Sequence, residues 1–161
     1  MSKDTYIVTA KEIAAMPPQT RVHFLNPNAR RKERDVGALT GLSEIGFQLV
    51  EVLPGHESTE HHVHHHEEEC LFVLEGEATA RVGADVYQLK PGDFMGCRKS
   101  GLAHSLKNDS DKPFRCIAIS QRKDHDVSDY PRAGKRLFRN RDLTWNMVDK
   151  RVIDRPFGVK T

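Results

Sequence analysis

The sequence predicts an all-β fold, most simply a single small β-barrel. Short apolar runs fill the middle of the chain from about residue 45 to residue 121, and turn residues such as Pro54-Gly55 and Pro91-Gly92 separate them. Strands that recur at such close spacing are typical of a sandwich or barrel. A chain of 161 residues suits one core.

Each expected strand ends at a recognisable turn. The first strand is closed by Pro54-Gly55, and later strands by Glu75-Gly76-Glu77, Gly83-Ala84-Asp85 and Lys90-Pro91-Gly92-Asp93. The expected strands are Ile45–Leu53, Cys70–Leu74, Ala78–Val82, Val86–Leu89, Phe94–Cys97, His104–Asn108 and Phe114–Ser120. We therefore place the barrel core at about residues 44–121.

Two flanking regions complete a single domain of residues 1–161. The N-terminal extension, residues 1–43, contains one expected helix, Thr9–Met16, with Thr9 as the N-cap and Pro17-Pro18 as the stop. The C-terminal tail, residues 122–161, is polar and basic with scattered apolar anchors. We expect it to wrap the barrel or a partner subunit.

Composition excludes several classes of protein. The formal net charge of +2 is too small to indicate nucleic-acid binding, and the densest basic run, Arg30, Arg31, Lys32 and Arg34, is interpreted as a solvated loop. No run approaches the ~18 apolar residues of a membrane span. Three cysteines cannot all pair, which favours a reducing, cytoplasmic location.

A histidine-rich segment lies between the first two barrel strands. Residues 55–69 hold six of the nine histidines, and in an extended segment His62 and His64 face the same side. Glu69 opens the next apolar strand, where an unpaired carboxylate is costly unless a cation meets it. His104 starts a later strand after a glycine turn and is well placed to fold back over the first pair. These residues predict a metal site.

The spacing of these residues resembles the two motifs of the cupin superfamily. His62, His64, Glu69 and Gly76 stand at the intervals of its first motif, and Gly101, His104 and Asn108 at those of its second. One extra residue separates Gly55 from His62, and Lys99 replaces a proline. The resemblance implies a jelly-roll, double-stranded β-helix barrel in which His62, His64, Glu69 and His104 bind the metal.

The whole chain also resembles small bacterial proteins with a single cupin domain and a tail containing Tyr-Pro, here Tyr130-Pro131. Some of these are labelled sugar-phosphate isomerases, by analogy of fold. Single-domain members of the superfamily commonly pair, and exposed edge strands need covering, so we expect a homodimer.

Residues around the predicted ligands have several possible roles. His61, His65 and His66 are possible additional ligands, but we expect them at solvent or a dimer contact, because alternation turns His61 and His65 away and His66 lies in the turn. We expect Glu67 and Glu68 in solvent, because only Glu69 stands at the interval of the resembled family before Gly76. Arg98 and Lys99 are candidates for binding an anionic substrate, or else form an exposed basic turn. Met95, Cys97, Tyr87 and Phe72 either contact a ligand or fill the barrel.

Three imidazoles and a carboxylate suit one divalent transition-metal ion, Zn, Mn, Fe, Ni, Co or Cu, without identifying it. The ion would leave a position open for a small-molecule substrate. The first hypothesis is a metal-dependent isomerase acting on a small oxygen-rich molecule, with His23 and Glu51 as candidates for the base. The alternatives are a dioxygenase or decarboxylase, and a sensor or binding protein without turnover.

Overall fold

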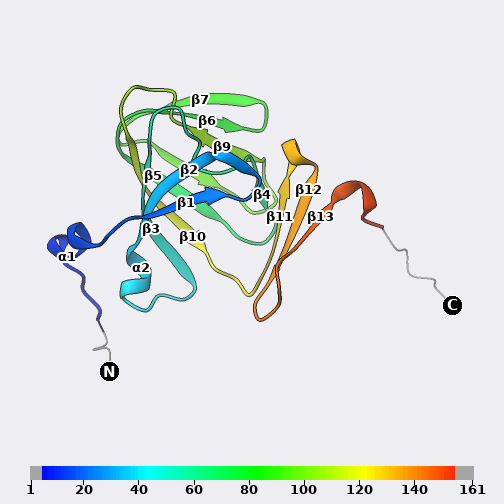
Figure 1. Cartoon of the computed structure of the whole chain (residues 1–161), viewed down its shortest axis with the longest axis horizontal. Coiled ribbons are helices and arrows are strands. Elements are labelled where there is room, and N and C mark those ends of the chain that lie inside the picture. Colours follow the sequence, from blue (N-terminus) through cyan, green and yellow to red (C-terminus); the bar gives the residue numbers. More distant parts are fainter. Residues whose placement is uncertain (1–4, 155–161) are drawn as a thin grey trace.

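Three antiparallel sheets form most of the structure, a computed structural model that describes residues 5–154 (Figure 1). The largest sheet has the strand order β1-β2-β3-β10-β5-β8. Its strands are β1 (Gln19–His23), β2 (Asn26–Asp35), β3 (Ile45–Val52), β5 (Glu69–Glu75), β8 (Phe94–Cys97) and β10 (Phe114–Gln121).

Two smaller sheets complete the set. One has the order β7-β6-β9, with β6 at Ala78–Val82, β7 at Asp85–Leu89 and β9 at His104–Lys107. The other has the order β13-β12-β11-β4, and its strands are β4 (Val63–His64), β11 (His125–Tyr130), β12 (Lys135–Asn140) and β13 (Asn146–Asp149). The predicted all-β jelly roll is confirmed.

The seven strands predicted from the sequence are all present, and their ends agree within one residue. Turn residues fix these ends well because proline and glycine limit or permit particular backbone angles. The predicted N-terminal helix is also present as α1 (Ala10–Ala15), with Thr9 and Glu12 forming a capping box.

The other helical segments are short: α2 (Val36–Leu39) and the 3-10 turns Pro131–Ala133 and Lys150–Val152. Among residues 5–154, no helix has the length and apolar character needed to cross a membrane.

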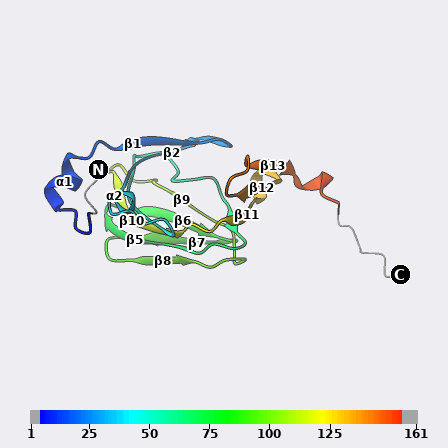
Figure 2. The ribbon, with the colours of Figure 1, turned by 90° about the horizontal axis from the view of Figure 1, so that it is seen from below.

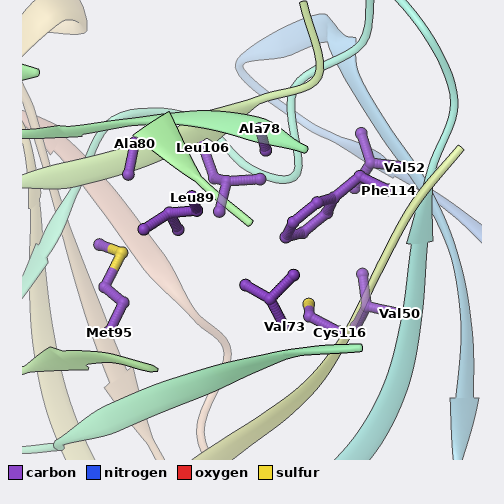
Figure 3. Packing of buried hydrophobic residues seen from close by; sticks show 10 residues of the cluster. All are labelled: Val50, Val52, Val73, Ala78, Ala80, Leu89, Met95, Leu106, Phe114 and Cys116. Carbon is purple, nitrogen blue, oxygen red and sulfur yellow. The ribbon is translucent and has the colours of Figure 1, made fainter. Parts of the chain in front are cut away.

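The hydrophobic core lies between the largest sheet and the β7-β6-β9 sheet. Alternation along β3 turns Val50 and Val52 inward, as expected for strands with one buried face. Phe114 is fully buried between the sheets, and Figure 3 shows its ring among side chains from both of them. The core cluster is Val50, Val52, Val73, Ala78, Ala80, Leu89, Met95, Leu106, Phe114 and Cys116.

The basic run is a strand and not the predicted solvated loop. It forms part of β2, which pairs with both β1 and β3. Charged side chains alternate between the two faces of β2. Lys32 Nζ lies 3.4 Å from Glu51 Oε1 on one face, and Arg31 Nε lies 2.9 Å from Glu33 Oε2 on the other. The interpretation was wrong because Glu33 within the run and Glu51 on the neighbouring strand compensate its charges.

The C-terminal tail reaches back to the histidine segment. Ser128 and Asp129 of β11 pair with His64 and Val63 of β4, so the tail lies against the barrel over these residues. Beyond this contact β12 and β13 extend to one side of the barrel (Figures 1 and 2). Asp129 fixes the tail internally through two bonds from Arg136, at 2.6 and 2.8 Å. Residues 155–161 of the predicted tail lie outside the described residues.

Gly76 provides a test of this architecture. It has φ +75°, and a Cβ at this position would collide with the carbonyl oxygen of Pro113. Gly92 has φ +92° but no atom within 4 Å of such a Cβ. Both Gly76→Ala and Gly92→Ala should cost about 1–2 kcal/mol for the left-handed backbone. Gly76→Ala should lose a further ~1–3 kcal/mol through overpacking.

Urea unfolding followed by circular dichroism measures both losses. Equal losses for the two variants would show that the β5–β6 turn does not press against Pro113.

Candidate metal centre

Four side chains predicted as ligands come together at one end of the barrel. The backbone N–H of His62 donates to the His104 carbonyl at 3.0 Å, and the reverse bond is 2.8 Å. This pairing brings the histidine segment beside β9. The Nε2 atoms of His62 and His64 are 3.1 Å apart, and Glu69 Oε1 lies 3.4 Å from His62 Nε2 and 2.5 Å from His104 Nε2.

Backbone carbonyls orient two of the imidazoles. His62 Nδ1 donates to the carbonyl of Glu60 at 2.8 Å, and His104 Nδ1 to that of Leu102 at 3.4 Å. A carbonyl oxygen only accepts, so in each ring Nδ1 carries the hydrogen and the neutral ring has its lone pair on Nε2. Both Nε2 atoms therefore face the Glu69 carboxylate, where they donate an N–H when the ring is charged and offer a lone pair to a metal ion when it is neutral.

Asp126 orients the third imidazole. Its Oδ2 lies 2.5 Å from His64 Nδ1 and accepts from Ser128 Oγ at 3.1 Å, while its Oδ1 accepts from the backbone N–H of His66 at 3.1 Å. Asp126 is only 2% exposed. An acidic partner behind a histidine is the usual arrangement around metal ligands. Asp126 and Ser128 were not predicted as part of the site, although their period-two spacing was a signal of a strand.

The charges and hydrogen bonds of the centre favour a cation beside the Glu69 carboxylate. Burial raises the pKa of Glu69, but bonds from His104 and His62 outweigh it and hold that pKa well below its usual range. Burial lowers the pKa of His104, but contacts with the Cys97 thiol and with Glu69 outweigh it and raise the pKa to about 10. The carboxylate is therefore ionised, and a cation close to it is stabilised.

The donor set fits a metal ion. Two imidazole lone pairs at 3.1 Å repel each other unless a cation, a proton or a metal ion, lies between them. Three imidazole nitrogens and one carboxylate oxygen suit a divalent transition metal. His62, Glu69 and His104 have ligand atoms within 4.8 Å of one another. A second such group, His64, Glu67 and Asp126, is already compensated, because Glu67 pairs with Arg139.

A cavity of about 230 Å³ adjoins these side chains. This is below the ~300–1,000 Å³ of sites for drug-sized ligands, so only a small molecule fits. Its polar lining includes Arg31, Gln48, Thr59 and Tyr130. Burial raises the pKa of Tyr130 to about 12, so its hydroxyl keeps its proton. Tyr130 also stacks on His62, with 6.0 Å between ring centroids.

The two basic residues predicted to bind substrate are exposed. Arg98 borders a neighbouring hollow that shares Glu69, Cys70 and Cys97 with the cavity. Lys99 lines neither of these two spaces. The expected base candidates are also outside the cavity lining: Glu51 pairs with Arg115 at 2.9 Å, and His23 stacks on Phe24.

Several expectations about neighbouring residues were wrong. His61 is buried, with Nδ1 3.0 Å from Ser105 Oγ, and Glu67 is buried against Arg139. Strand alternation could not reveal these partners, which come from β9 and from the tail. His66 and Glu68 are exposed as predicted, whereas His65 is half-buried and lies 3.3 Å from Asp129.

Of the four residues expected to contact a ligand or fill the barrel, two do so and two do not. Met95 and Cys97 both pack in or against the core and line the cavity. Tyr87 and Phe72 fill neither barrel nor cavity, since they are 51% and 44% exposed. The expectation was wrong for Phe72 and Tyr87, because the pleat of β5 and β7 turns both side chains away from the interior.

Comparisons with known proteins agree with the predicted resemblance. Residues 48–120 match the cupin domain family. A crystal structure from Acidithiobacillus ferrooxidans, provisionally named a sugar phosphate isomerase, is 43% identical, with a TM-score of 0.91, 94% of this chain covered and 97% of that one. No curated protein matches the chain.

More distant structures share the fold. A Silicibacter pomeroyi protein named a sugar phosphate isomerase of the cupin superfamily is 21% identical, with a TM-score of 0.76, and the match covers 84% of this chain and 90% of that one. A predicted oxalate decarboxylase from Thermotoga maritima is 19% identical, with a TM-score of 0.58 over 71% of this chain and 97% of that one.

Proposed function

Since the chain belongs to the cupin superfamily, we propose that it is a metal-dependent enzyme that isomerises a small oxygen-rich molecule such as a sugar phosphate. One observation carries the proposal: His62, Glu69 and His104 have ligand atoms within 4.8 Å of one another, and His64 Nε2 adjoins this group at 3.1 Å from His62 Nε2, beside a small polar cavity. In this proposal these four residues hold one divalent ion, Zn, Mn, Fe, Ni, Co or Cu.

A bound ion would supply Lewis acidity, polarising a substrate carbonyl or hydroxyl. The protein's own groups orient the substrate. The Tyr130 hydroxyl keeps its proton and lines the cavity, so it donates a hydrogen bond to a substrate oxygen. Arg98 borders the adjoining hollow, and we keep it, together with its neighbour Lys99, as candidates for contacting a part of the substrate outside the cavity.

Isomerisation is preferred to the other reactions that this ligand set permits. The relative that is 43% identical over nearly its whole length is provisionally named a sugar phosphate isomerase. The predicted oxalate decarboxylase is only 19% identical, a likeness that supports the fold alone. A dioxygenase, a decarboxylase and a binding protein without turnover remain the alternatives.

The three free cysteines also support the predicted cytoplasmic location.

Metal uptake is the first prediction. The wild-type protein should bind one equivalent of Zn²⁺ or Co²⁺, and His62→Ala or His104→Ala should abolish this uptake because each removes a ligand. Asp126→Asn should weaken binding about 10–100-fold, as expected when the partner of a ligating histidine is altered. Calorimetry and elemental analysis measure both effects.

The matched control is His66→Ala. His66 lies in the same segment but is exposed, so its removal should leave affinity and stoichiometry unchanged. Stoichiometric uptake by a folded His62→Ala, His104→Ala double variant would disprove the proposed ligand set.

Turnover is the second prediction. The metal-loaded protein should interconvert aldose and ketose phosphates, with deuterium from D₂O incorporated at the carbon that loses its proton. Proton NMR follows both events. The metal-free protein and His104→Ala should be inactive. Tight binding of a sugar phosphate without conversion would instead favour a binding protein, and release of CO₂ or consumption of O₂ with organic acids would favour the other enzymes.

We also propose that the protein forms a homodimer through the outer face of its largest sheet. Cross-strand pairing places apolar side chains in rows on this face, and Phe94 on the edge strand β8 is 66% exposed. The face comprises Phe47, Leu49, Cys70, Phe72, Phe94, Ile117 and Ile119. Exposed apolar patches and open strand edges mark interfaces in many proteins, and a second copy would cover both.

Light scattering tests the dimer. The wild-type protein should have twice the mass of one chain at micromolar concentration. Phe94→Asp should weaken association at least tenfold by placing a charge in the apolar face. Val86→Asp is the control, because Val86 is 51% exposed on β7 of another sheet. A monomeric wild-type protein, or equal effects of the two variants, would contradict the proposed interface.

A further inference from the structure

One basic side chain of β2 lies inside the barrel. Along this strand Ala29 and Glu33 are buried, while Arg30 is exposed, so Arg31 shares the inward face. Among the described residues that line the cavity, Arg31 is the single arginine or lysine. The cavity thus has Glu69 and the three imidazoles in one part of its wall and a guanidinium in another.

Two contacts hold this guanidinium in place. Arg31 Nε donates to Glu33 Oε2 at 2.9 Å, and Nη1 donates to the Ser58 carbonyl at 2.7 Å. A guanidinium has five N–H donors, so these two bonds leave three. Its side chain is 27% exposed, in keeping with donors that face the cavity rather than protein partners. The guanidinium is therefore fixed in position, and N–H donors remain for a ligand.

The positive charge of Arg31 is only partly compensated. Glu33 is 5% exposed and shares its carboxylate between Arg31 and Arg21, whose Nε lies 2.8 Å from Oε1. Two guanidinium groups against one carboxylate leave one positive charge. Burial raises the pKa of the Cys116 thiol to about 12, and the charge of Arg31 acts on it in the opposite direction. The positive charge of Arg31 therefore acts on a side chain inside the barrel.

We propose that Arg31 anchors an oxyanion, a phosphate or carboxylate group, of the small molecule that enters the cavity. This inference rests on the proposed function, because the rest of that molecule would meet the metal centre. Arginine suits the role, since its planar fork matches the oxygens of both groups. The cavity of about 230 Å³ is small enough for one ligand to reach both parts of the wall.

The alternative is that Arg31 only supports the fold by tying β2 to Glu33 and Ser58. That role requires no more than the two observed bonds, and it gives no reason for an anion to bind. Anion affinity therefore separates the two roles, whereas stability alone does not.

Inorganic phosphate and acetate are the probes, titrated into the metal-free full-length protein at low salt. Nitrogen-15 NMR follows the Arg31 Nε–H signal of the wild type, isothermal titration calorimetry measures the affinity of the wild type and of every variant, and circular dichroism checks folding. Both ions should shift this signal saturably, and the tighter of the two identifies the preferred oxyanion. Arg31→Gln should raise the dissociation constant at least tenfold. Arg31→Lys should fall between, because it keeps the charge but loses the fork.

Arg30→Gln is the matched control. It removes the same charge from the same strand, but Arg30 is exposed, so phosphate affinity should not change. The proposal is overturned if neither ion binds the wild-type protein, or if Arg31→Gln binds as the wild type does. Should Arg31→Gln fail to fold, Arg31→Lys decides: an affinity equal to wild type overturns the proposal, and a weaker one supports it.

The outcome is independent of the metal. A protein that binds phosphate at Arg31 but takes up no metal would disprove the proposed function and keep this inference. A protein that takes up metal but binds phosphate equally well without Arg31 would disprove this inference and keep the proposed function.

Discussion

The backbone pairing between His62 and His104 determines the geometry of the whole centre. Two reciprocal hydrogen bonds, at 3.0 and 2.8 Å, join a segment that precedes β4 to the first residue of β9. They hold the His62–His64 segment of the first motif against β9, which carries the histidine of the second motif. Because the pairing also fixes the carbonyl that orients each neighbouring ring, the direction of the Nε2 lone pairs follows from main-chain geometry, which side-chain mobility cannot easily disturb.

The barrel strands and the converging residues were predictable from the sequence because their signals are local. Short apolar runs identified β3, β5 and β10, and turn residues between the runs fixed their ends. The strands β2 and β11 were missed because charged residues occupy both of their faces. Their charges are compensated by distant partners, such as Glu51 for Lys32 and His64 for Asp126, and no local pattern reveals such pairs.

The same limit explains which parts of the site were missed. The four residues His62, His64, Glu69 and His104 stand at recognisable intervals, whereas Arg31, Asp126 and Tyr130 come from flanking strands. Asp126 and Tyr130 reach the site only because β11 pairs with β4. The flanks therefore supply orientation and cavity lining, features that can change between related proteins while the motif intervals stay the same.

Charge balance relates these flanking groups to the kind of molecule that the cavity favours. In the proposed centre, the +2 charge of a divalent ion is balanced by the Glu69 carboxylate and by the Asp126 carboxylate that contacts His64. The Arg21, Glu33 and Arg31 group leaves one positive charge close to the cavity. A neutral sugar would leave this charge uncompensated in a partly desolvated space, which is costly. A small anion bound at Arg31 would remove that cost, so the charge of Arg31 favours phosphorylated or acidic substrates over neutral ones.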